Sequence, residues 1–121
     1  MKTFVTLILV LCSFAGYSQA SKDLIGKWQL VKITKNGTEK SIREQFKSDQ
    51  VYQVFEEGGK FEGIIAEESI NGKWKLSKGD KVLTVTVKLI PVKFNLEYID
   101  GIKRVIYHKQ LGTLEYKKVQ E

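Results

Sequence analysis

One pentapeptide pattern occurs twice in the chain, as Gly26-Lys27-Trp28-Gln29-Leu30 and as Gly72-Lys73-Trp74-Lys75-Leu76. Alternate side chains of a β-strand point to opposite faces, so Gly, Trp and Leu of each copy share one face and the polar side chains the other. Two strands therefore begin with a Trp directed inward. The repeat predicts an antiparallel sheet that is closed or nearly closed, and it carries little information about chemistry.

The first twenty residues have the anatomy of a secretory signal peptide. Lys2 supplies a positive charge, residues 4–14 form an apolar run, and Ser18-Gln19-Ala20 offers the small residues that signal peptidase reads. The run is shorter than the roughly 20 residues that a membrane-spanning helix needs. We expect residues 1–20 to be cleaved, leaving one domain of residues 21–121 that is exported to the periplasm or the extracellular space.

A membrane anchor and a lipoprotein are the alternatives to a cleaved signal. Lipid attachment at Cys12 needs a small preceding residue, whereas Leu11 is bulky. Cys12 is the only cysteine of the chain, so the mature domain is expected to contain no disulfide, thiolate nucleophile or cysteine-based metal site. It also lacks a further apolar stretch of transmembrane length.

The chain is basic, with 20 Lys and Arg against 14 Asp and Glu. Most of the positive charge is lysine that alternates with apolar residues along the predicted strands, as is typical of a solvated outer face. Arg43 and Arg104 are the only arginines. A nucleic-acid surface favours arginine, whose planar fork suits phosphate and guanine, so we expect no nucleic-acid partner.

Apolar runs recur about every ten residues after the signal, with turn residues between them. Asn36-Gly37 is predicted to end the first strand, Asn71-Gly72 to form a tight turn before the fourth, and Asp100-Gly101 to form a type I′ hairpin turn. Pro91 is predicted to separate two strands because it cannot donate to a central ladder. The predicted strands are residues 24–35, 50–56, 60–66, 73–77, 81–89, 92–98, 102–109 and 111–119.

Eight strands in sequence order favour an up-and-down meander, which removes its exposed edges by closing into a barrel. A two-sheet sandwich is the structural alternative, and crossing connections would distinguish it. The one long link, residues 38–49, carries Ile42 and Phe46 four residues apart. The predicted fold class is all-β, an eight-stranded antiparallel barrel with a short helix or loop between strands one and two.

Three short motifs follow one another along this pattern. They are a Gly-x-Trp strand (Gly26, Trp28), a Phe-x-x-x-Gly-x-Phe hairpin (Phe55, Gly59, Phe61) and a second Gly-x-Trp (Gly72, Trp74). In this order they resemble the small bacterial lipocalin-like domains over nearly the whole mature chain. In full-length lipocalins an Arg or Lys near the chain end packs across the Gly-x-Trp indole. The resemblance implies this structural role for Arg104, with Lys117 and Lys118 as competing candidates.

The resemblance implies a binding protein that holds a small, mostly apolar ligand in the cup of the barrel. In the lipocalin pattern Trp28 lies toward the closed end, so lining residues come from the other strand ends. The expected lining residues are Phe61, Ile65, Leu83, Phe94 and Tyr98. Strands of about seven residues give a barrel only about 18 Å tall, near the limit at which side chains fill the interior. The alternative is a filled barrel that serves as an envelope or extracellular interaction module for a protein or polysaccharide.

The predicted seventh strand has apolar groups on both faces. Ile102, Arg104, Ile106 and His108 alternate with Lys103, Val105, Tyr107 and Lys109. This pattern indicates a contact on the outer face, either with the segment of Ile42 and Phe46 or with a protein partner.

Catalytic machinery is scarce in the sequence. His108 is the only histidine and is expected near the surface, so we expect no common zinc site and no other cofactor. Glu56-Glu57 and Glu67-Glu68 are paired acids at two hairpin ends, where acidic residues are common. Paired carboxylates serve glycoside hydrolysis in some enzymes, which leaves a cryptic enzyme as a third hypothesis that fails if these side chains are dispersed and solvated. We expect the protein not to be an enzyme.

Overall fold

The structure, a computed structural model, describes residues 18–120. The predicted signal peptide lies outside this range except for its last three residues. The elements in chain order are α2 (Gln19–Leu24), β1 (Gly26–Lys35), β2 (Thr38–Lys40), α3 (Ile42–Phe46), β3 (Val51–Glu56), β4 (Lys60–Ile65), β5 (Glu68–Ser77), β6 (Val82–Val87), β7 (Ile90–Ile99), β8 (Lys103–His108) and β9 (Gly112–Lys118).

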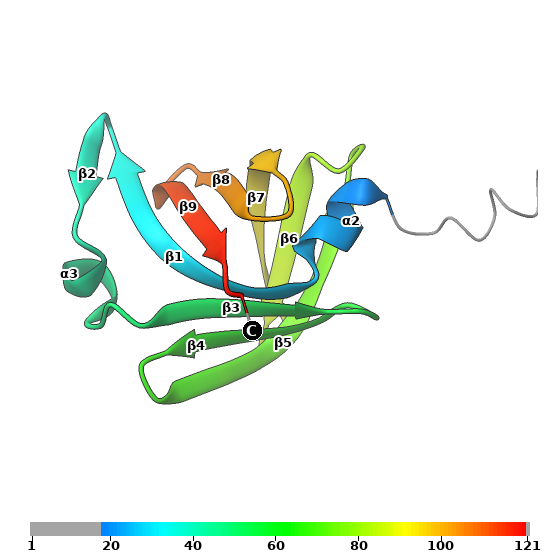
Figure 1. Cartoon of the computed structure of the whole chain (residues 1–121), viewed down its shortest axis with the longest axis horizontal. Coiled ribbons are helices and arrows are strands. Elements are labelled where there is room, and N and C mark those ends of the chain that lie inside the picture. The colour runs from blue at the N-terminus through cyan, green and yellow to red at the C-terminus, as the bar shows by residue number, and fades with distance from the viewer. Residues whose placement is uncertain (1–17, 121) are drawn as a thin grey trace, which may run out of the picture.

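The strands form one antiparallel barrel. Each strand from β3 to β9 pairs with the next, and β1 pairs with both β3 and β9, which closes the sheet. The predicted eight-stranded barrel is therefore confirmed, and the sandwich alternative is wrong because the strands of residues 18–120 form one closed sheet. The remaining strand, β2, pairs only with the last three residues of β1 and extends from the barrel (Figure 1).

Two short helices lie at opposite ends of the barrel. α2 lies beside the beginning of β1, whereas β2 and α3 lie beyond its end (Figure 1). The indole Nε1 of Trp28 donates a 2.8 Å hydrogen bond to the carbonyl oxygen of Leu24, and both side chains are fully buried. α2 thus plugs the end that the first Trp occupies, and we call this the closed end.

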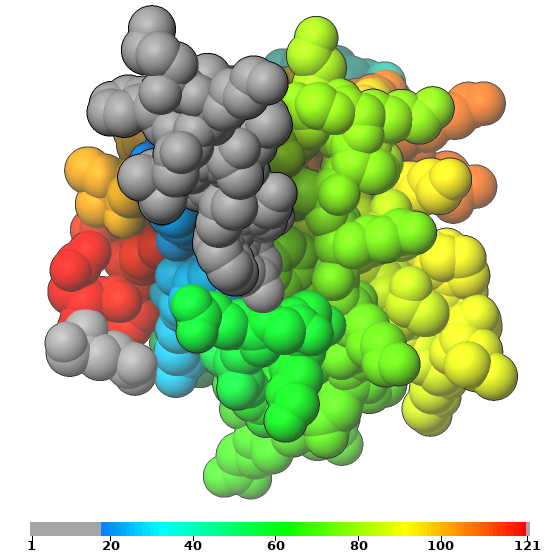
Figure 2. Space-filling view, turned by 90° about the vertical axis from the view of Figure 1, so that its right-hand side faces the viewer, coloured from blue at the N-terminus to red at the C-terminus, as the bar shows by residue number. Residues whose placement is uncertain are grey.

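Aromatic side chains fill the closed half of the interior. Phe55 makes edge-to-face contacts with Phe61 and Trp74, with ring centroids 5.2 and 5.8 Å apart. The Nε1 group of Trp74 donates to the carbonyl oxygen of Glu56 at 2.9 Å. Both indoles are therefore buried and hydrogen-bonded. Figure 2 views the closed end, where the green side chains around the β3–β4 turn lie against the lime side chains of β5.

The predicted turn at Asn71-Gly72 is wrong. Both residues lie inside β5, and Gly72 pairs with Phe61 of β4. The chain turns earlier, at Ala66 and Glu67, where Ala66 has a φ of 56°. Gly72 serves close packing, because a Cβ atom there would collide with the carbonyl oxygen of Thr86 on β6.

The Asp100-Gly101 link also differs from prediction, because neither residue has the positive φ that a type I′ turn requires. The Asp100 carboxylate instead accepts backbone N–H groups of Ile102 and Lys103, each at 2.8 Å. The tight β6–β7 turn is made by Lys88 and Leu89, with φ values of 52° and 69°. Pro91 does not separate strands. It lies within β7, paired with Thr86.

Candidate ligand-binding cup

The open half of the barrel, toward β2 and α3, contains a cavity of about 590 Å³ that we call the cup. Its walls come from α3, from β3, β4, β5, β7 and β9, and from the β8–β9 turn. The lining residues are Phe46, Val51, Tyr52, Gln53, Gly63, Ile64, Ile65, Glu68, Ser69, Ile70, Phe94, Leu111, Leu114 and Tyr116. The lining is predominantly apolar, as is typical of small-molecule sites.

A glycine forms part of the wall of the cup. Along β4, alternate positions Phe61, Gly63 and Ile65 follow one face. Phe61 is buried in the filled half, whereas Gly63 presents no side chain at the level of the cup. Its cross-strand neighbours, Gln53 on β3 and Ile70 on β5, also line the cup. The interior is therefore filled at the closed end and hollow at the open end, unlike the uniformly filled barrel of the alternative hypothesis.

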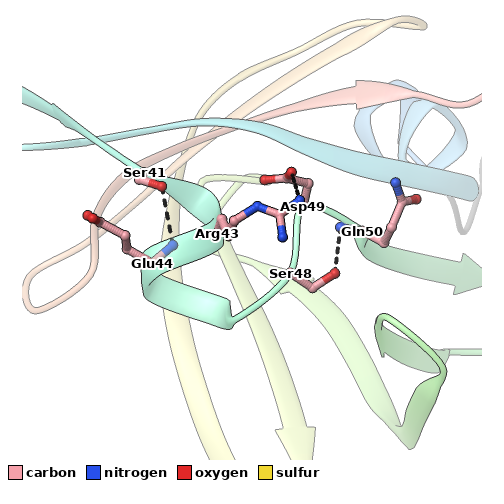
Figure 3. Close-up of polar contacts among 6 residues, drawn as sticks. All are labelled: Ser41, Arg43, Glu44, Ser48, Asp49 and Gln50. Carbon is pink, nitrogen blue, oxygen red and sulfur yellow. Dashed lines mark hydrogen bonds and ion pairs between the residues drawn. The ribbon is translucent and has the colours of Figure 1, made fainter.

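The α3 segment forms one wall of the mouth. Ser41 caps the helix by accepting the backbone N–H of Glu44, and Ser48 accepts that of Gln50 after the helix ends (Figure 3). An exposed ion pair between Arg43 and Asp49 ties the helix to the strand entrance. These contacts hold Phe46 against the core.

A second hollow of about 540 Å³ adjoins the cup between α3, the β1–β2 hairpin and the β8–β9 turn. Phe46, Leu111 and Leu114 line both spaces. These three apolar side chains form the partition between the two hollows.

A positive charge lies below the floor of the cup. Arg104 on β8 is fully buried, and its Nη2 group donates a 2.7 Å hydrogen bond to Oε1 of Gln53. Its guanidinium carbon lies 4.0, 4.8 and 5.1 Å from the ring centroids of Tyr116, Phe55 and Trp28. Burial lowers the pKa of Arg104 from its ordinary value to about 10, and it raises the pKa of Tyr116. Arg104 remains a cation at neutral pH.

Trp28 has a second cation on its ring. Nζ of Lys118 lies 4.8 Å from the ring centroid and donates to the carbonyl oxygen of Ile25 at 2.9 Å. Burial lowers the pKa of Lys118. Lys117, the remaining candidate for this role, is exposed. The first Gly-x-Trp indole is thus contacted by both Arg104 and Lys118.

The five predicted lining residues separate into three groups. Ile65 and Phe94 line the cup. Phe61 and Leu83 are buried in the packed core and are absent from its wall. Tyr98 is 48% exposed, and its hydroxyl donates to Asp100 outside the barrel.

A β-bulge explains the position of Tyr98. The pairing of β7 with β8 shifts between Leu96 and Tyr98, because one extra residue, Glu97, lies between these paired positions on β7, whereas their partners on β8 are adjacent in the chain. Strict alternation predicts an inward Tyr98, but the extra residue exchanges the inner and outer faces for the residues of β7 that follow it. Ile99, opposite Arg104, packs against the core instead.

The inner face of β8 is carried by Arg104 and Ile106, both fully buried, and Tyr107 of the outer face is 37% exposed. The segment of Ile42 and Phe46 does not cover this outer face. It packs near β1 and against the core. An outer protein partner of β8 stays a prediction.

The paired acids do not form a common site. Glu56, Glu57, Glu67 and Glu68 are exposed, the first pair at the closed end and the second at the open end. His108 is half-buried, and its Nδ1 atom accepts backbone N–H groups of the β8–β9 turn. Within residues 18–120, no three His, Cys, Asp or Glu side chains gather as metal ligands. No helix of the described range is long and apolar enough to cross a bilayer.

Sequence reasoning missed Gln53, Gly63 and Tyr116 as parts of the cup. Gln53 and Gly63 lie on predicted strands, two residues from Phe55 and Phe61 respectively. Residues two apart on a strand share a face, so both positions are predicted to point inward. A polar residue and a glycine on an otherwise apolar inner face were the available signal. Tyr116, on the predicted strand of residues 111–119, belongs to the floor as well.

Comparison with known proteins agrees with this architecture. The lipocalin-like domain model matches residues 24–108. A lipocalin-like protein from Bacteroides uniformis is similar in structure, with a TM-score of 0.66 at 18% identity, over 80% of this chain and 99% of that one. An uncharacterized protein from Bacteroides eggerthii gives 0.65 at 16% identity, over 79% and 99%. No curated protein matches the chain. The family match and the closed barrel together show that the chain belongs to the lipocalin-like domain family.

Proposed function

We propose that this protein is an exported, non-catalytic binding protein that holds a small, mostly apolar molecule in the cup. The observation that carries the proposal is the cavity of about 590 Å³ at the open end. Ligand sites of proteins commonly measure about 300–1,000 Å³ and combine apolar walls with a few polar groups. Gln53 and Tyr116 provide such polar groups on the floor.

Filling the cup tests the proposal directly. In the variant Gly63→Leu, the new Cβ has ordinary contact distances of 3.5 Å to Ile70 and Phe61, and the longer side chain extends into the space that the glycine leaves free. The matched control is Gly101→Leu, at an exposed turn where a Cβ atom meets nothing within 4 Å. The probe is the neutral dye N-phenyl-1-naphthylamine, whose fluorescence rises in apolar sites.

We expect the dye to bind saturably to the wild type and to Gly101→Leu, and neutral alkanols to displace it. Its binding to Gly63→Leu should be at least about tenfold weaker, which corresponds to a loss of about 1.4 kcal/mol of binding free energy. Absence of binding by the wild type contradicts the proposal. Equal binding by Gly63→Leu, with an unchanged circular dichroism spectrum, contradicts the assignment of the cup.

Export is the second part of the proposal, and it rests on the anatomy of residues 1–20. Expression of the full chain in a Gram-negative host, followed by fractionation and intact-mass measurement, tests it. The expected product is a periplasmic or secreted form that begins near Ser21. A full-length product in the cytoplasm contradicts it.

A further inference from the structure

The buried charge of Arg104 has no acidic partner within the described range. Residues 18–120 form two ion pairs, Arg43 with Asp49 and Lys103 with Glu115, and neither includes it. Arg104 is the one charged side chain of this range that is buried. Its Nε and Nη1 groups have no hydrogen-bond partner among the described residues. Its Nη2 group donates to a neutral amide, that of Gln53. A buried cation normally has a counter-charge, so this one is unusual.

The uncompensated charge lies directly behind the floor of the cup. Gln53 accepts a hydrogen bond from Arg104 and also lines the cup. Tyr116 contacts Arg104 through its ring and lines the cup as well. Arginine is a donor only, so the Gln53 oxygen must face it, which leaves the amide NH₂ of Gln53 with further donor capacity. The Tyr116 hydroxyl is a second donor on the same floor.

The charge next to the floor of the cup favours an anion there, because Arg104 is the one buried charged side chain of the described range and contacts two floor residues. Glu68, which is exposed, is the single charged residue among the described residues that line the cup, and none of these residues is basic. The chain as a whole carries a formal net charge of +6. Charges interact more strongly across a poorly solvated interior than through water. A negative group on the floor would therefore gain from Arg104 without a direct contact.

We propose that the ligand is an amphipathic anion whose carboxylate lies on the floor against Gln53 and Tyr116, next to Arg104, while its apolar part fills the cup. This inference rests on the proposed function, because it names the chemical class of the ligand for the same site. It also assigns Arg104 a role in ligand selection in addition to its packing against Trp28.

Three ligands with the same chain and different head groups test the proposal: decanoate, 1-decanol and decylammonium. Their affinities for the wild-type protein are measured by isothermal titration calorimetry, below their micelle concentrations and at a pH well above the pKa of the fatty acid. We expect decanoate to bind at least about tenfold more tightly than 1-decanol, equal to about 1.4 kcal/mol. Decylammonium is expected to bind most weakly.

A charge introduced at Gln53 tests whether Arg104 is the source of this preference. In Gln53→Glu the new carboxylate lies where Oε1 now accepts from Nη2 of Arg104, so the protein supplies its own counter-charge. We expect the preference for decanoate over 1-decanol to disappear, whatever the change in the absolute affinity for 1-decanol. The matched control, Gln29→Glu, makes the same substitution on β1 away from the cup and should keep the preference.

The outcomes separate this inference from the proposed function. Equal binding of decanoate and 1-decanol by the wild type overturns the anionic ligand and leaves the apolar cup in place. A preference that survives in folded Gln53→Glu overturns the role of Arg104. Failure of all three ligands to bind, together with failure of the neutral dye, overturns both. If Gln53→Glu does not fold, the order of the three head groups in the wild type still decides whether the ligand is an anion.

Discussion

The guanidinium carbon of Arg104 lies 4.0 Å from the ring centroid of Tyr116, closer than it lies to the rings of Trp28 and Phe55. Both residues are buried and occupy paired positions on neighbouring strands β8 and β9. Cation–π contacts gain strength when the cation is desolvated. The pair therefore offsets part of the cost of burying a charge that has no acidic partner among residues 18–120.

Replacement of Tyr116 separates this contact from the hydroxyl group. We expect Tyr116→Leu to lower the free energy of unfolding by about 2–4 kcal/mol, through lost packing and lost cation–π attraction. Tyr116→Phe retains the ring, so a cost of about 1 kcal/mol or less is expected. Urea unfolding, followed by circular dichroism, measures both. Similar losses in the two variants would show that the ring contact with Arg104 contributes little.

Asp100 is predicted to make stability depend on pH. Its carboxylate accepts hydrogen bonds from the Tyr98 hydroxyl and from the backbone N–H groups of Ile102 and Lys103, which lower its pKa below the ordinary value, with the Tyr98 bond as the largest cause. Because the folded state holds the proton more weakly than the unfolded state, this contribution is present above the unfolded pKa and is lost as the pH falls through the folded pKa.

We therefore expect Asp100→Ala to lower Tm at neutral pH, and the difference from wild type to shrink as the pH falls below about 4, near the pKa of an unperturbed Asp. Glu57→Ala, in the β3–β4 turn, is the control, since its exposed carboxylate makes none of these contacts. Thermal melts across the acidic range measure the effect. A difference that stays constant with pH would assign the loss to turn geometry instead of to the ionised carboxylate.

The barrel itself could be predicted because period-two alternation is read from the residues directly. The Trp28 and Trp74 repeats marked inward faces, and the short links left closure as the simplest arrangement. Both indoles are buried in the structure, and the pairing of β1 with β9 closes the sheet.

Most of the cup could not be predicted from the same pattern. The β7 bulge before Tyr98 reverses parity, and its position depends on the pairing with β8 and not on the residues of β7 alone. Leu83 alternates correctly but lies at a level where the interior is filled. Alternation gives the face of each residue, whereas membership of the cup depends on strand stagger and on neighbours across the barrel.

Replacement by alanine is predicted to have different effects on stability at two glycines in neighbouring strands. A Cβ at Gly72 would collide with the Thr86 carbonyl oxygen, so Gly72→Ala must separate β5 from β6. We expect it to cost at least about 1–3 kcal/mol. Gly63→Ala finds only ordinary contacts at 3.5 Å or more and should be tolerated or slightly stabilising. Urea midpoints give both values, and equal costs would contradict this account of the β5–β6 contact.

The closed end gives the last prediction, which concerns the plug formed by α2. Leu24 is fully buried, and its carbonyl oxygen accepts the Trp28 indole N–H. Leu24→Ala keeps the backbone hydrogen bond and removes buried methyl groups, so the free energy of unfolding should fall by about 2–5 kcal/mol. The matched control is Leu89→Ala, whose side chain is 93% exposed at the β6–β7 turn, with an expected change within about 0.5 kcal/mol.

Both variants are best measured in the chain that begins at Ser21, the expected mature form, because Leu24 remains in it. If the plug is intact after cleavage, the two variants should differ in free energy of unfolding by the same amount in this chain as in the chain beginning at Ser18. A smaller difference in the mature form would mean that residues 18–20, including the cap that Ser18 gives to the backbone N–H of Ser21, are needed to hold Leu24 in place. The closed end would then depend on residues that export is expected to remove, and the contribution of the α2 plug would be smaller in the mature protein.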